Sequence, residues 1–529
     1  MAMVNEYRLK LRWLIVVATI IRCLFANFIE LGNDEVYYFT YAQHLDWNHF
    51  DHPPMVGLLI RFFTLNLYWL NDFSMRFGAI IMAAFNTWLI ASIARQLMSE
   101  RAGLIAAVLY TASLYSSIIS GLFILPDSIA NTFWIASLYS MLCIVMKESN
   151  EKQNAQFLLL GLWIGLACMS KVHSIFLWFG FIGYILFFQR QLLKNKFLYF
   201  SILISLICIL PIWLWNEYYQ YITWKFHSQR VSLIESGIRL DFFSQAFFGQ
   251  IFYNNPLLVY LYIIVLIQLT RNKFKIYGIS NHIVYLLLFC SIPIILATTG
   301  VSFFRQALPH WSGPGFFGLM IISALWIDYR LDLNNIPRLR RLLNMQLGFT
   351  FSIMLFAVLL IHWFPGNLFS NADKQHLGQG DVTLDMLGWK DFKTQFEQIR
   401  ARDIENNSMK STDAILVHNW FPAGHLYYYV AMPLDMRLIA EGKLTDIHKF
   451  AWLNLAQQPL KIGEDAYYIS PSNNFIDPNN LYADLFKEIK LRKVLEQHRG
   501  NKIVRYWNIY QLKSAKVTIG NKHPLAYQE

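Results

Sequence analysis

Residues 33–54 read NDEVYYFTYAQHLDWNHFDHPP and follow directly on a long apolar stretch. This segment holds the densest cluster of ionisable groups in the first half of the chain and ends in two prolines: Asp34, Glu35, Asp46, Asp51, His44, His49 and His52. Charged groups are costly inside a bilayer. We therefore expect the segment to lie at a membrane surface, directly after a first membrane-crossing helix.

The rest of the chain up to about residue 363 predicts a polytopic α-helical membrane protein. Only 15% of the 529 residues are charged, against about 25% in soluble domains, and 55% are hydrophobic. Apolar runs of about 20 residues, the length that crosses a bilayer, recur throughout this part. We expect about eleven spans, at residues 11–30, 75–94, 102–121, 128–146, 157–171, 174–189, 197–215, 256–270, 282–300, 311–327 and 346–363. The first follows a basic preamble without a small-residue cleavage site, which predicts a retained helix.

The apolar run Met55–Leu70 is the difficult one. Its 16 residues would extend about 24 Å as a helix, short of the roughly 30 Å hydrocarbon core. It begins at two prolines and carries Arg61. We predict an interfacial helix that lies along the membrane surface.

Basic residues support this topology, because cytoplasmic loops are enriched in Lys and Arg. With eleven spans, one side carries seventeen of them: Arg8, Lys10, Arg12, Arg95, Arg101, Lys147, Lys152, Arg190, Lys194, Lys196, Arg271, Lys273, Lys275, Arg330, Arg338, Arg340 and Arg341. The other side, without the tail, carries seven: Arg61, Arg76, Lys171, Lys225, Arg230, Arg239 and Arg305. The second side is therefore predicted to face outward, together with residues 33–54 and the C-terminal tail.

Several cations at one outer surface suggest binding of an anionic headgroup or a phosphate. The alternative is ordinary snorkelling, which we favour for Arg61, Arg76 and Arg239 taken singly. Lys171 differs, because MSKVHS separates two apolar spans with almost no loop to solvate it. A functional role is favoured there.

Two outward connections also carry acids. Asp34 and Glu35 precede a predicted helix, and Asp127 begins another in ILPDSIAN. Each has a structural alternative, since Asn33 or the acids themselves would suit a helix start. Together with the outward cations, the acids favour acid–base chemistry on a phosphate-bearing substrate.

A series of short motifs runs through about residues 10–365: DE at 34–35, YFTYAQHL at 38–45, FDHPPMVGLL at 50–59, LPDS at 125–128, SKVHS at 170–174, PIWLWN at 211–216 and LPHWSGPGF at 308–316. Their order resembles the bacterial membrane glycosyltransferases of the GT-C fold, in the branch related to protein O-mannosyltransferases and to the lipid A aminoarabinose transferase. The resemblance implies a polyprenyl-phosphate-linked sugar donor used at the outer face of the cytoplasmic membrane. It also implies a catalytic acid at Asp34, a second acid at Asp127 and a functional lysine at Lys171. The aminoarabinose branch typically has a lysine where this chain has His52.

The chemistry of such a transfer agrees with these residues. A phosphate leaving group needs cations rather than a protonating acid, whereas the acceptor hydroxyl needs a base. We assign Asp34 as the base of an inverting displacement, with Asp127 and Glu35 orienting the acceptor or the base. Lys171, Arg305 and His52 are candidate ligands of the donor phosphate. A set of candidate substrate contacts completes the site: His310, Asp51 and Tyr38.

No essential metal or other cofactor is expected, although Asp34, Glu35 and the histidines leave a divalent ion as an alternative. The five cysteines lie inside predicted spans, which indicates small buried residues rather than disulfides. We expect a membrane and a lipid or glycan acceptor as partners, and no nucleic acid. A nucleotide-sugar donor is not expected, since the sequence has no Gly-rich phosphate loop.

The last third of the chain is more polar and predicts a separate outward domain. We divide the chain into a transmembrane catalytic domain, residues 1–365, and an extracytoplasmic mixed α/β domain, residues 366–529. Strands are predicted at 413–420, 465–471 and 502–512, and a helix at 421–430. This domain would cap the outward site and help to choose the acceptor.

Three other functions remain open from sequence, and one of them is a non-catalytic scaffold in which Asp34 and Asp127 would only cap helices. A transporter or flippase for a lipid-linked glycan would bury charges near the bilayer midplane, whereas here they collect at span ends. An oligosaccharyltransferase would share the fold, but the tail has no WWDYG-like stretch. The leading prediction is a multi-pass glycosyltransferase of the bacterial inner membrane that acts on lipid A or another glycolipid, a glycan or a protein.

Overall fold

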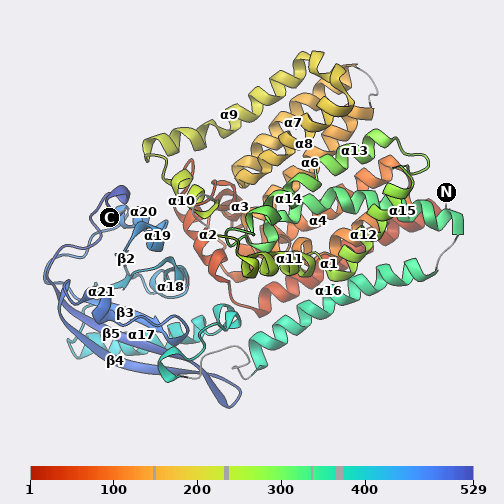
Figure 1. Cartoon of the computed structure of the whole chain (residues 1–529). Helices are drawn as coiled ribbons and strands as arrows, with labels where there is room; N and C mark the ends of the chain where they lie inside the picture. The colour runs from red at the N-terminus through yellow and green to blue at the C-terminus, as the bar shows by residue number, and fades with distance from the viewer. Residues whose placement is uncertain are drawn as a thin grey trace. The chain divides into compact units, whose positions relative to one another are not determined.

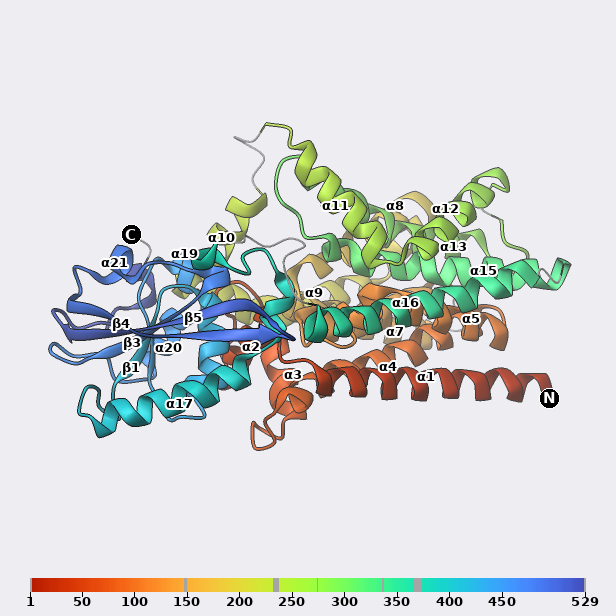
Figure 2. The same ribbon diagram turned by 90° about the horizontal axis from the view of Figure 1, so that it is seen from below.

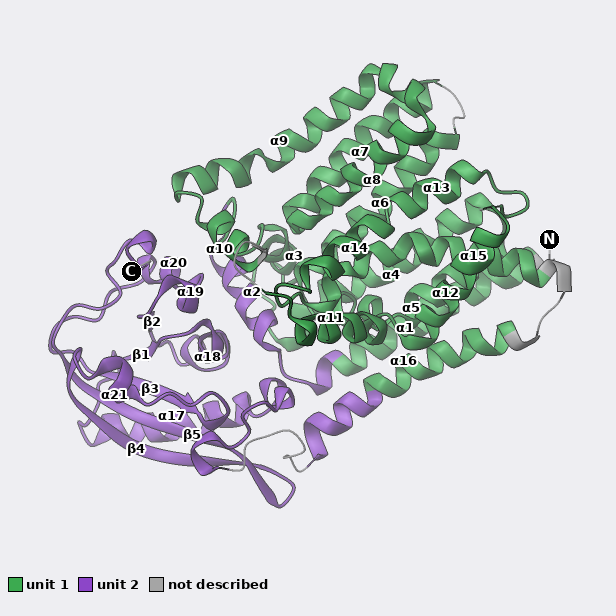
Figure 3. Ribbon diagram, in the orientation of Figure 1, with its two compact units in different colours: residues 1–25, 47–354 green, residues 26–46, 355–529 purple. Residues whose placement is uncertain are grey.

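The computed structural model describes residues 2–146, 150–231, 237–273, 275–334, 337–364 and 373–527. Lys147, the side chain of Arg338 and the predicted boundary at residue 365 lie outside them. Figure 1 shows a largely helical chain with one small sheet. It divides into two compact units, coloured in Figure 3: unit 1 is Met1–Phe25 with Trp47–Met354, and unit 2 is Ala26–Asp46 with Leu355–Glu529.

Unit 1 is helical. Helices α1 (Ala2–Phe28) and α16 (Pro337–Trp363) begin in unit 1 and end in unit 2. The others are α3 (Met55–Phe63), α4 (Asp72–Leu97), α5 (Glu100–Ala112), α6 (Pro126–Met146), α7 (Asn150–Ser170), α8 (Phe176–Phe188), α9 (Lys196–Tyr218), α10 (Ile222–Val231), α11 (Leu240–Tyr253), α12 (Pro256–Arg271), α13 (Asn281–Phe289), α14 (Ile292–Val301) and α15 (Phe316–Asn334).

Each of the eleven predicted spans overlaps a described helix. Residues 102–121 comprise α5 and a π-helical turn, residues 282–300 comprise α13 with α14, and residues 311–327 begin in the 3-10 helix Pro309–Gly315 and continue into α15. By length and composition, five described helices can cross a membrane: Asp72–Leu97, Pro126–Met146, Lys196–Tyr218, Asn281–Val301 and Leu339–Trp363. The number rises to seven if the bent pairs Val4–Phe28 with Asn33–Gln43 and Leu240–Tyr253 with Pro256–Arg271 each count as one span. The chain thus has the helices of a multi-pass membrane protein, and the count of eleven stays a prediction.

The run Met55–Leu70 does not form a membrane-length helix. Helix α3 ends at Phe63 after nine residues, which extend about 14 Å, and turns follow. This length agrees with a helix that does not span. Its location at the membrane surface stays a prediction.

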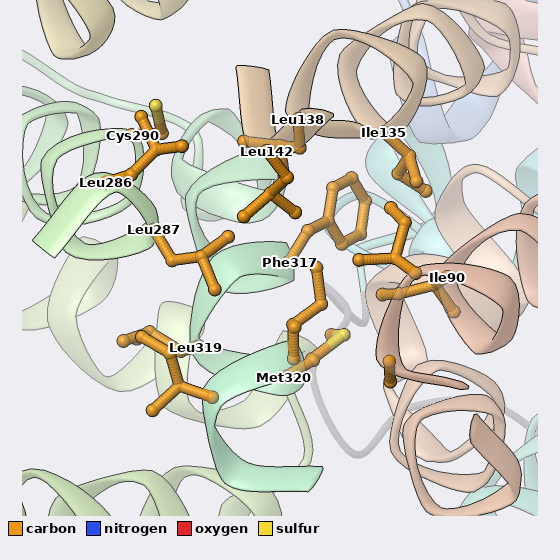
Figure 4. Close-up of a cluster of buried hydrophobic side chains, with 14 of the residues drawn as sticks. Ile90, Ile135, Leu138, Leu142, Leu286, Leu287, Cys290, Phe317, Leu319 and Met320 are labelled. Atoms are coloured by element: carbon orange, nitrogen blue, oxygen red, sulfur yellow. The ribbon is translucent and has the colours of Figure 1, made fainter. Parts of the chain in front are cut away.

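Helix α15 runs through the hydrophobic core of unit 1. Figure 4 shows Phe317, Leu319 and Met320 of this helix among side chains from α4, α6 and α13, including Ile90, Leu138 and Leu287. Lipid tails are as apolar as these side chains, so their packing rather than their transfer from water holds such helices together. The core therefore fixes the positions of α4, α6 and α13 around α15.

Small residues allow α7 and α9 to approach closely. A Cβ atom on Gly161 would lie 2.2 Å from the carbonyl oxygen of Ser201, and one on Gly165 would lie 2.6 Å from Cys208 Cβ. The Ser205 hydroxyl donates a hydrogen bond of 2.6 Å to the Gly161 carbonyl. This seam, one helical turn long, is typical of helix pairs in membranes. Of the five cysteines, Cys168 and Cys290 are buried as predicted, whereas Cys23, Cys143 and Cys208 are only partly buried.

Unit 2 contains a five-stranded mixed sheet in the order β2-β1-β3-β5-β4. The strands are β1 (Ala414–Val417), β2 (Leu438–Ala440), β3 (Ala466–Pro471), β4 (Phe486–Arg499) and β5 (Lys502–Ala515). Strand β1 pairs in parallel with β2 and β3, whereas β5 is antiparallel to β3 and β4. The helices of this unit are α2 (Asn33–Gln43), α17 (Trp389–Glu405), α18 (Trp420–His425), α19 (Leu444–Ile447), α20 (Phe450–Leu455) and α21 (Pro478–Tyr482).

Helix α17 covers one face of this sheet (Figure 2). Phe392 stacks on Trp507 of β5 with ring centroids 4.2 Å apart, and Phe396 meets Tyr467 of β3 edge-on at 5.2 Å. The three strands predicted for the tail are present as β1, β3 and β5, and the predicted helix is present as α18 with the π-helix Leu426–Ala431. The tail is therefore mixed α/β, with β2 and β4 as strands that the sequence analysis missed.

Candidate active site

An ion pair between Asp127 and Lys171 forms the centre of a polar group in unit 1. Asp127 is the second residue of α6, and Lys171 lies where α7 ends and the 3-10 helix Val172–Ile175 begins. The Lys171 ammonium donates to both carboxylate oxygens of Asp127, at 2.8 and 3.0 Å. Both side chains are buried, with exposed fractions of 9% for Lys171 and 2% for Asp127. A buried pair of this kind persists because each charge compensates the other.

The Tyr115 hydroxyl completes the contacts of the Asp127 carboxylate. It donates to Asp127 Oδ1 at 2.8 Å and lies 3.0 Å from Oδ1 of Asn131, one turn along α6. The oxygens of Asp127 are thus engaged by side chains of other segments, so the alternative in which Asp127 only caps α6 does not fit. The ring of Tyr115 packs against Gly313, where an added Cβ would lie 2.4 Å from it. Gly313, the first glycine of LPHWSGPGF, therefore makes room for the Tyr115 ring, whose hydroxyl donates to Asp127.

Three histidines lie within electrostatic reach of this pair: His52, His173 and His310. Burial lowers the pKa of His52 to about 3, with the nearby Asp51 opposing the shift. Burial also lowers the pKa of His310 to about 4, helped by the charge of Lys171. Both rings are therefore neutral near pH 7. A phosphate contact from His52 would be a hydrogen bond rather than an ion pair.

The loop that carries Asp51 and His52 is fastened to α10. Asn48 donates to the Thr223 hydroxyl at 3.1 Å, and Thr223 donates to the His49 carbonyl at 3.2 Å. His227 Nε2 lies 2.6 Å from the Asp51 carbonyl oxygen. Helix α10, which the sequence analysis did not predict as a helix, thus holds the DHPP loop.

The acids Asp34 and Glu35 belong to unit 2. Gly32, rather than Asn33, is the N-cap of α2, and its amide donates to Glu35 Oε2 at 2.8 Å. The hypothesis that Asn33 caps this helix is wrong, because the Asn33 side chain donates instead to Asp385 Oδ2 at 2.8 Å. Glu35 is buried and Asp34 is exposed in the first turn. Asp34 is therefore the acid of the pair that solvent can reach.

Two other residues of the predicted site are Tyr38 and Arg305. Tyr38 is buried, with ring centroids 5.6 Å from Tyr37 and 5.4 Å from Tyr41. Arg305 is half-buried in the turn that follows α14. Its assignment to the donor phosphate, and that of Tyr38 to the substrate, stay predictions.

Sequence reasoning missed Tyr115, Asn131 and His173 in unit 1 and Asp385 in unit 2. Tyr115 and Asn131 lie inside apolar spans, where neither residue type stands out. His173 is part of the SKVHS motif, and both of its ring nitrogens are buried without a hydrogen-bond partner among the described residues. Asp385 lies in a polar segment more than 350 residues from its partner Asn33, so only the folded chain reveals it.

No group of three or more His, Cys, Asp or Glu side chains is placed to hold a metal ion in the part of the chain that the structure describes. The expectation of no essential metal stays a prediction.

Comparisons with known proteins give a consistent relationship. The model of the dolichyl-phosphate-mannose-protein mannosyltransferase family matches residues 51–215. The structure of ArnT from Cupriavidus metallidurans in the apo state superposes with a TM-score of 0.63 at 13% identity, covering 94% of this chain and 97% of ArnT. ArnT bound to undecaprenyl phosphate gives 0.62 at the same identity and coverage. Comparison with curated protein sequences gives no match. The chain therefore shares the fold of ArnT over most of its length, and its residues 51–215 are similar to the dolichyl-phosphate-mannose-protein mannosyltransferase family.

Proposed function

We propose that this protein is an inverting glycosyltransferase that moves a sugar from a polyprenyl-phosphate carrier to a lipid, glycan or protein acceptor. The observation that carries the proposal is the buried Lys171–Asp127 pair, a cation held at a helix break in a bundle of apolar helices. The fold supports it, because ArnT shares this fold and its structure is known with undecaprenyl phosphate bound.

The reaction is a single displacement. The acceptor oxygen forms a bond to the anomeric carbon, and the bond from that carbon to the phosphate oxygen breaks. The bonding electrons leave with the polyprenyl phosphate. The acceptor hydroxyl proton passes to the Asp34 carboxylate. Since no enzyme nucleophile takes part, the anomeric configuration inverts.

Each candidate residue has a role in this displacement. Lys171 has three N–H donors, and two of them point to Asp127. The third remains for a phosphate oxygen, whose charge grows as the leaving group departs. Arg305 and a neutral His52 would add further donors, and Glu35 holds the start of the helix that carries Asp34.

The test is transfer by purified protein. With polyprenyl-phosphate-linked sugars as donors and a membrane lipid extract as acceptor, we expect one donor to yield a new glycoconjugate by mass spectrometry. Nucleotide-linked forms of the same sugars serve as control donors and should yield none. Absence of transfer from every lipid-linked donor, or transfer from a nucleotide donor, would contradict the proposal. If a lipid-linked donor does support transfer, the glycolipid profile of a deletion strain would identify the natural acceptor.

We further propose that the catalytic loops and unit 2 face outward from the bacterial inner membrane, as the distribution of basic residues suggests. In a variant without the five native cysteines, Leu45→Cys should react with a membrane-impermeant maleimide in intact spheroplasts. Tyr277→Cys, in a turn on the opposite predicted side, should react only after permeabilisation. Both positions are exposed, by 40% and 81%. The reverse labelling pattern would invert the topology and exclude a donor site at the outer face.

A further inference from the structure

The residues just before Asp34 are held by the C-terminal part of unit 2. The Glu30 carboxylate accepts hydrogen bonds from the backbone amides of Trp389 and Lys390, at 2.8 and 3.1 Å. These are the first two residues of α17, where free amides and the helix dipole favour an anion. The Glu30 amide in turn donates to the Met386 carbonyl at 3.3 Å. The chain that enters α2 is therefore tied to the start of α17.

Leu31 continues the connection. Its amide donates to the Tyr429 hydroxyl at 2.7 Å, and His425 Nε2 lies 2.9 Å from its carbonyl oxygen. Gly424 lets the next turn approach, since an added Cβ would lie 2.9 Å from a methyl group of Val36. Both backbone polar groups of Leu31 are thus satisfied by residues almost 400 positions away, and the entry to α2 has one defined path.

A further contact involves Asn33, the residue directly before Asp34, and its partner is Asp385. Asn33 Nδ2 donates to Asp385 Oδ2 at 2.8 Å. The segment that carries Asp385 is itself fixed by Arg505 of β5, which is fully buried and donates to the carbonyls of Leu384 and Leu387 at 3.0 and 2.6 Å. The Arg505 guanidinium also lies 4.0 Å from the ring centroid of Trp507. Strand β5 therefore holds, through Arg505, the segment whose Asp385 carboxylate accepts the hydrogen bond from Asn33.

We propose that Asp385 is a positioning residue that orients Asp34 through Asn33, so that the C-terminal sheet sets the geometry of the proposed base. This inference rests on the proposed function. Asp385 itself touches no reacting atom in this scheme. Its loss would let the first turn of α2 move, and small displacements of a reacting group reduce turnover without changing substrate affinity.

The electrostatics of Asp385 provide a second signature. Burial raises its pKa to about 6, whereas Arg505 and the Asn33 hydrogen bond act to lower it and the charges of Asp381 and Asp34 act to raise it. A folded-state pKa above the ordinary 3.8 means that the folded protein binds this proton more tightly. The stability that this carboxyl contributes is full below about pH 4 and is lost as the pH rises through 6. Asp385→Asn removes that dependence.

The experiment compares Asp385→Ala, Asp385→Asn and Asn33→Ala with the wild type. We expect Asp385→Ala and Asn33→Ala to lower kcat by about tenfold to a hundredfold with KM changed less than about twofold. The double variant should lose no more than the worse single one, because both changes remove one interaction. Asp385→Asn keeps an acceptor oxygen and should recover most of the lost kcat. Glu397→Ala, at an exposed ion pair on α17, is the matched control and should behave as wild type.

Hydrogen exchange followed by mass spectrometry gives a readout that needs no activity. Amides of residues 33–37 should exchange several-fold faster in Asp385→Ala than in Asp385→Asn or Glu397→Ala. Wild-type turnover by Asp385→Ala would overturn the inference, as would equal losses in the Ala and Asn variants with unchanged exchange. If the wild type transfers no sugar, the proposed function fails, and the exchange rates still decide whether Asp385 orders the start of α2.

Discussion

Asp34→Asn protein is expected to fold normally and to transfer sugar about 10²–10⁴ times more slowly than the wild type, the usual effect of losing a general base. Asparagine has the shape of aspartate and suits a helix start equally well, but it cannot take up the proton of the sugar acceptor's hydroxyl group. The cap of α2 does not depend on Asp34, since Gly32 is the N-cap and Glu35 closes the turn. The substitution therefore separates chemistry from folding.

The measurement is the initial rate of transfer by detergent-purified, monodisperse protein beside the wild type. Asp391→Asn is the matched control, because Asp391 is also an exposed acid in the first turn of a helix of unit 2. It should transfer at the wild-type rate. If Asp34→Asn stays within about threefold of the wild type, far from the effect of a lost base, then Asp34 is not the base.

Lys171→Ala should have two separate effects. The first is on stability, because removal of the cation leaves the Asp127 carboxylate buried without its partner, and breaking a buried pair in this way costs about 3–5 kcal/mol. The second is on the reaction, since loss of a phosphate contact costs about 2–4 kcal/mol in kcat/KM. A single variant cannot distinguish them.

The double variant Lys171→Ala/Asp127→Asn separates the two effects when it is compared with Asp127→Asn alone, which accounts for any role of Asp127 in the reaction. Without the unpaired charge it should regain most of the thermal stability in detergent, while its kcat/KM stays low. Arg101→Ala is the control: Arg101 pairs with the buried Asp328, so this variant should be destabilised while its folded fraction turns over normally. Recovery of wild-type kcat/KM by the double variant would show that Lys171 has only a structural role.

Much of the helical framework follows from sequence because an apolar run of membrane length has few alternatives to a helix. The same runs do not reveal where a helix breaks: the π-helical turn Tyr115–Ile119 and the division into α13 and α14 depend on packing against neighbours. In the tail, short buried strands such as β1 have a clear β-branched pattern. Strand β4 was missed because its sequence, FKEIKLRKVLEQHR, is largely exposed and charged and has no regular alternation.

Some residues of the candidate site could also be identified from sequence, and others could not. Lys171 and Asp127 were identifiable because a charge at the end of an apolar span is rare and needs an explanation. Tyr115 and Asp385 were not, since a tyrosine in a span and an aspartate in a polar segment are ordinary in their own surroundings. The grouping of Ala26–Asp46 with the C-terminal part of the chain was also beyond sequence reasoning, because it rests on contacts between distant residues.

The hydrogen bond between Leu31 and Tyr429 has a consequence for how the protein is made. The two residues are 398 positions apart. At about 5–20 residues per second, the ribosome delivers Tyr429 roughly 20–80 seconds after Leu31. Until then the backbone that leads into α2 lacks this hydrogen-bond partner. A chain that ends before Tyr429 would therefore lack the partner of the Leu31 amide.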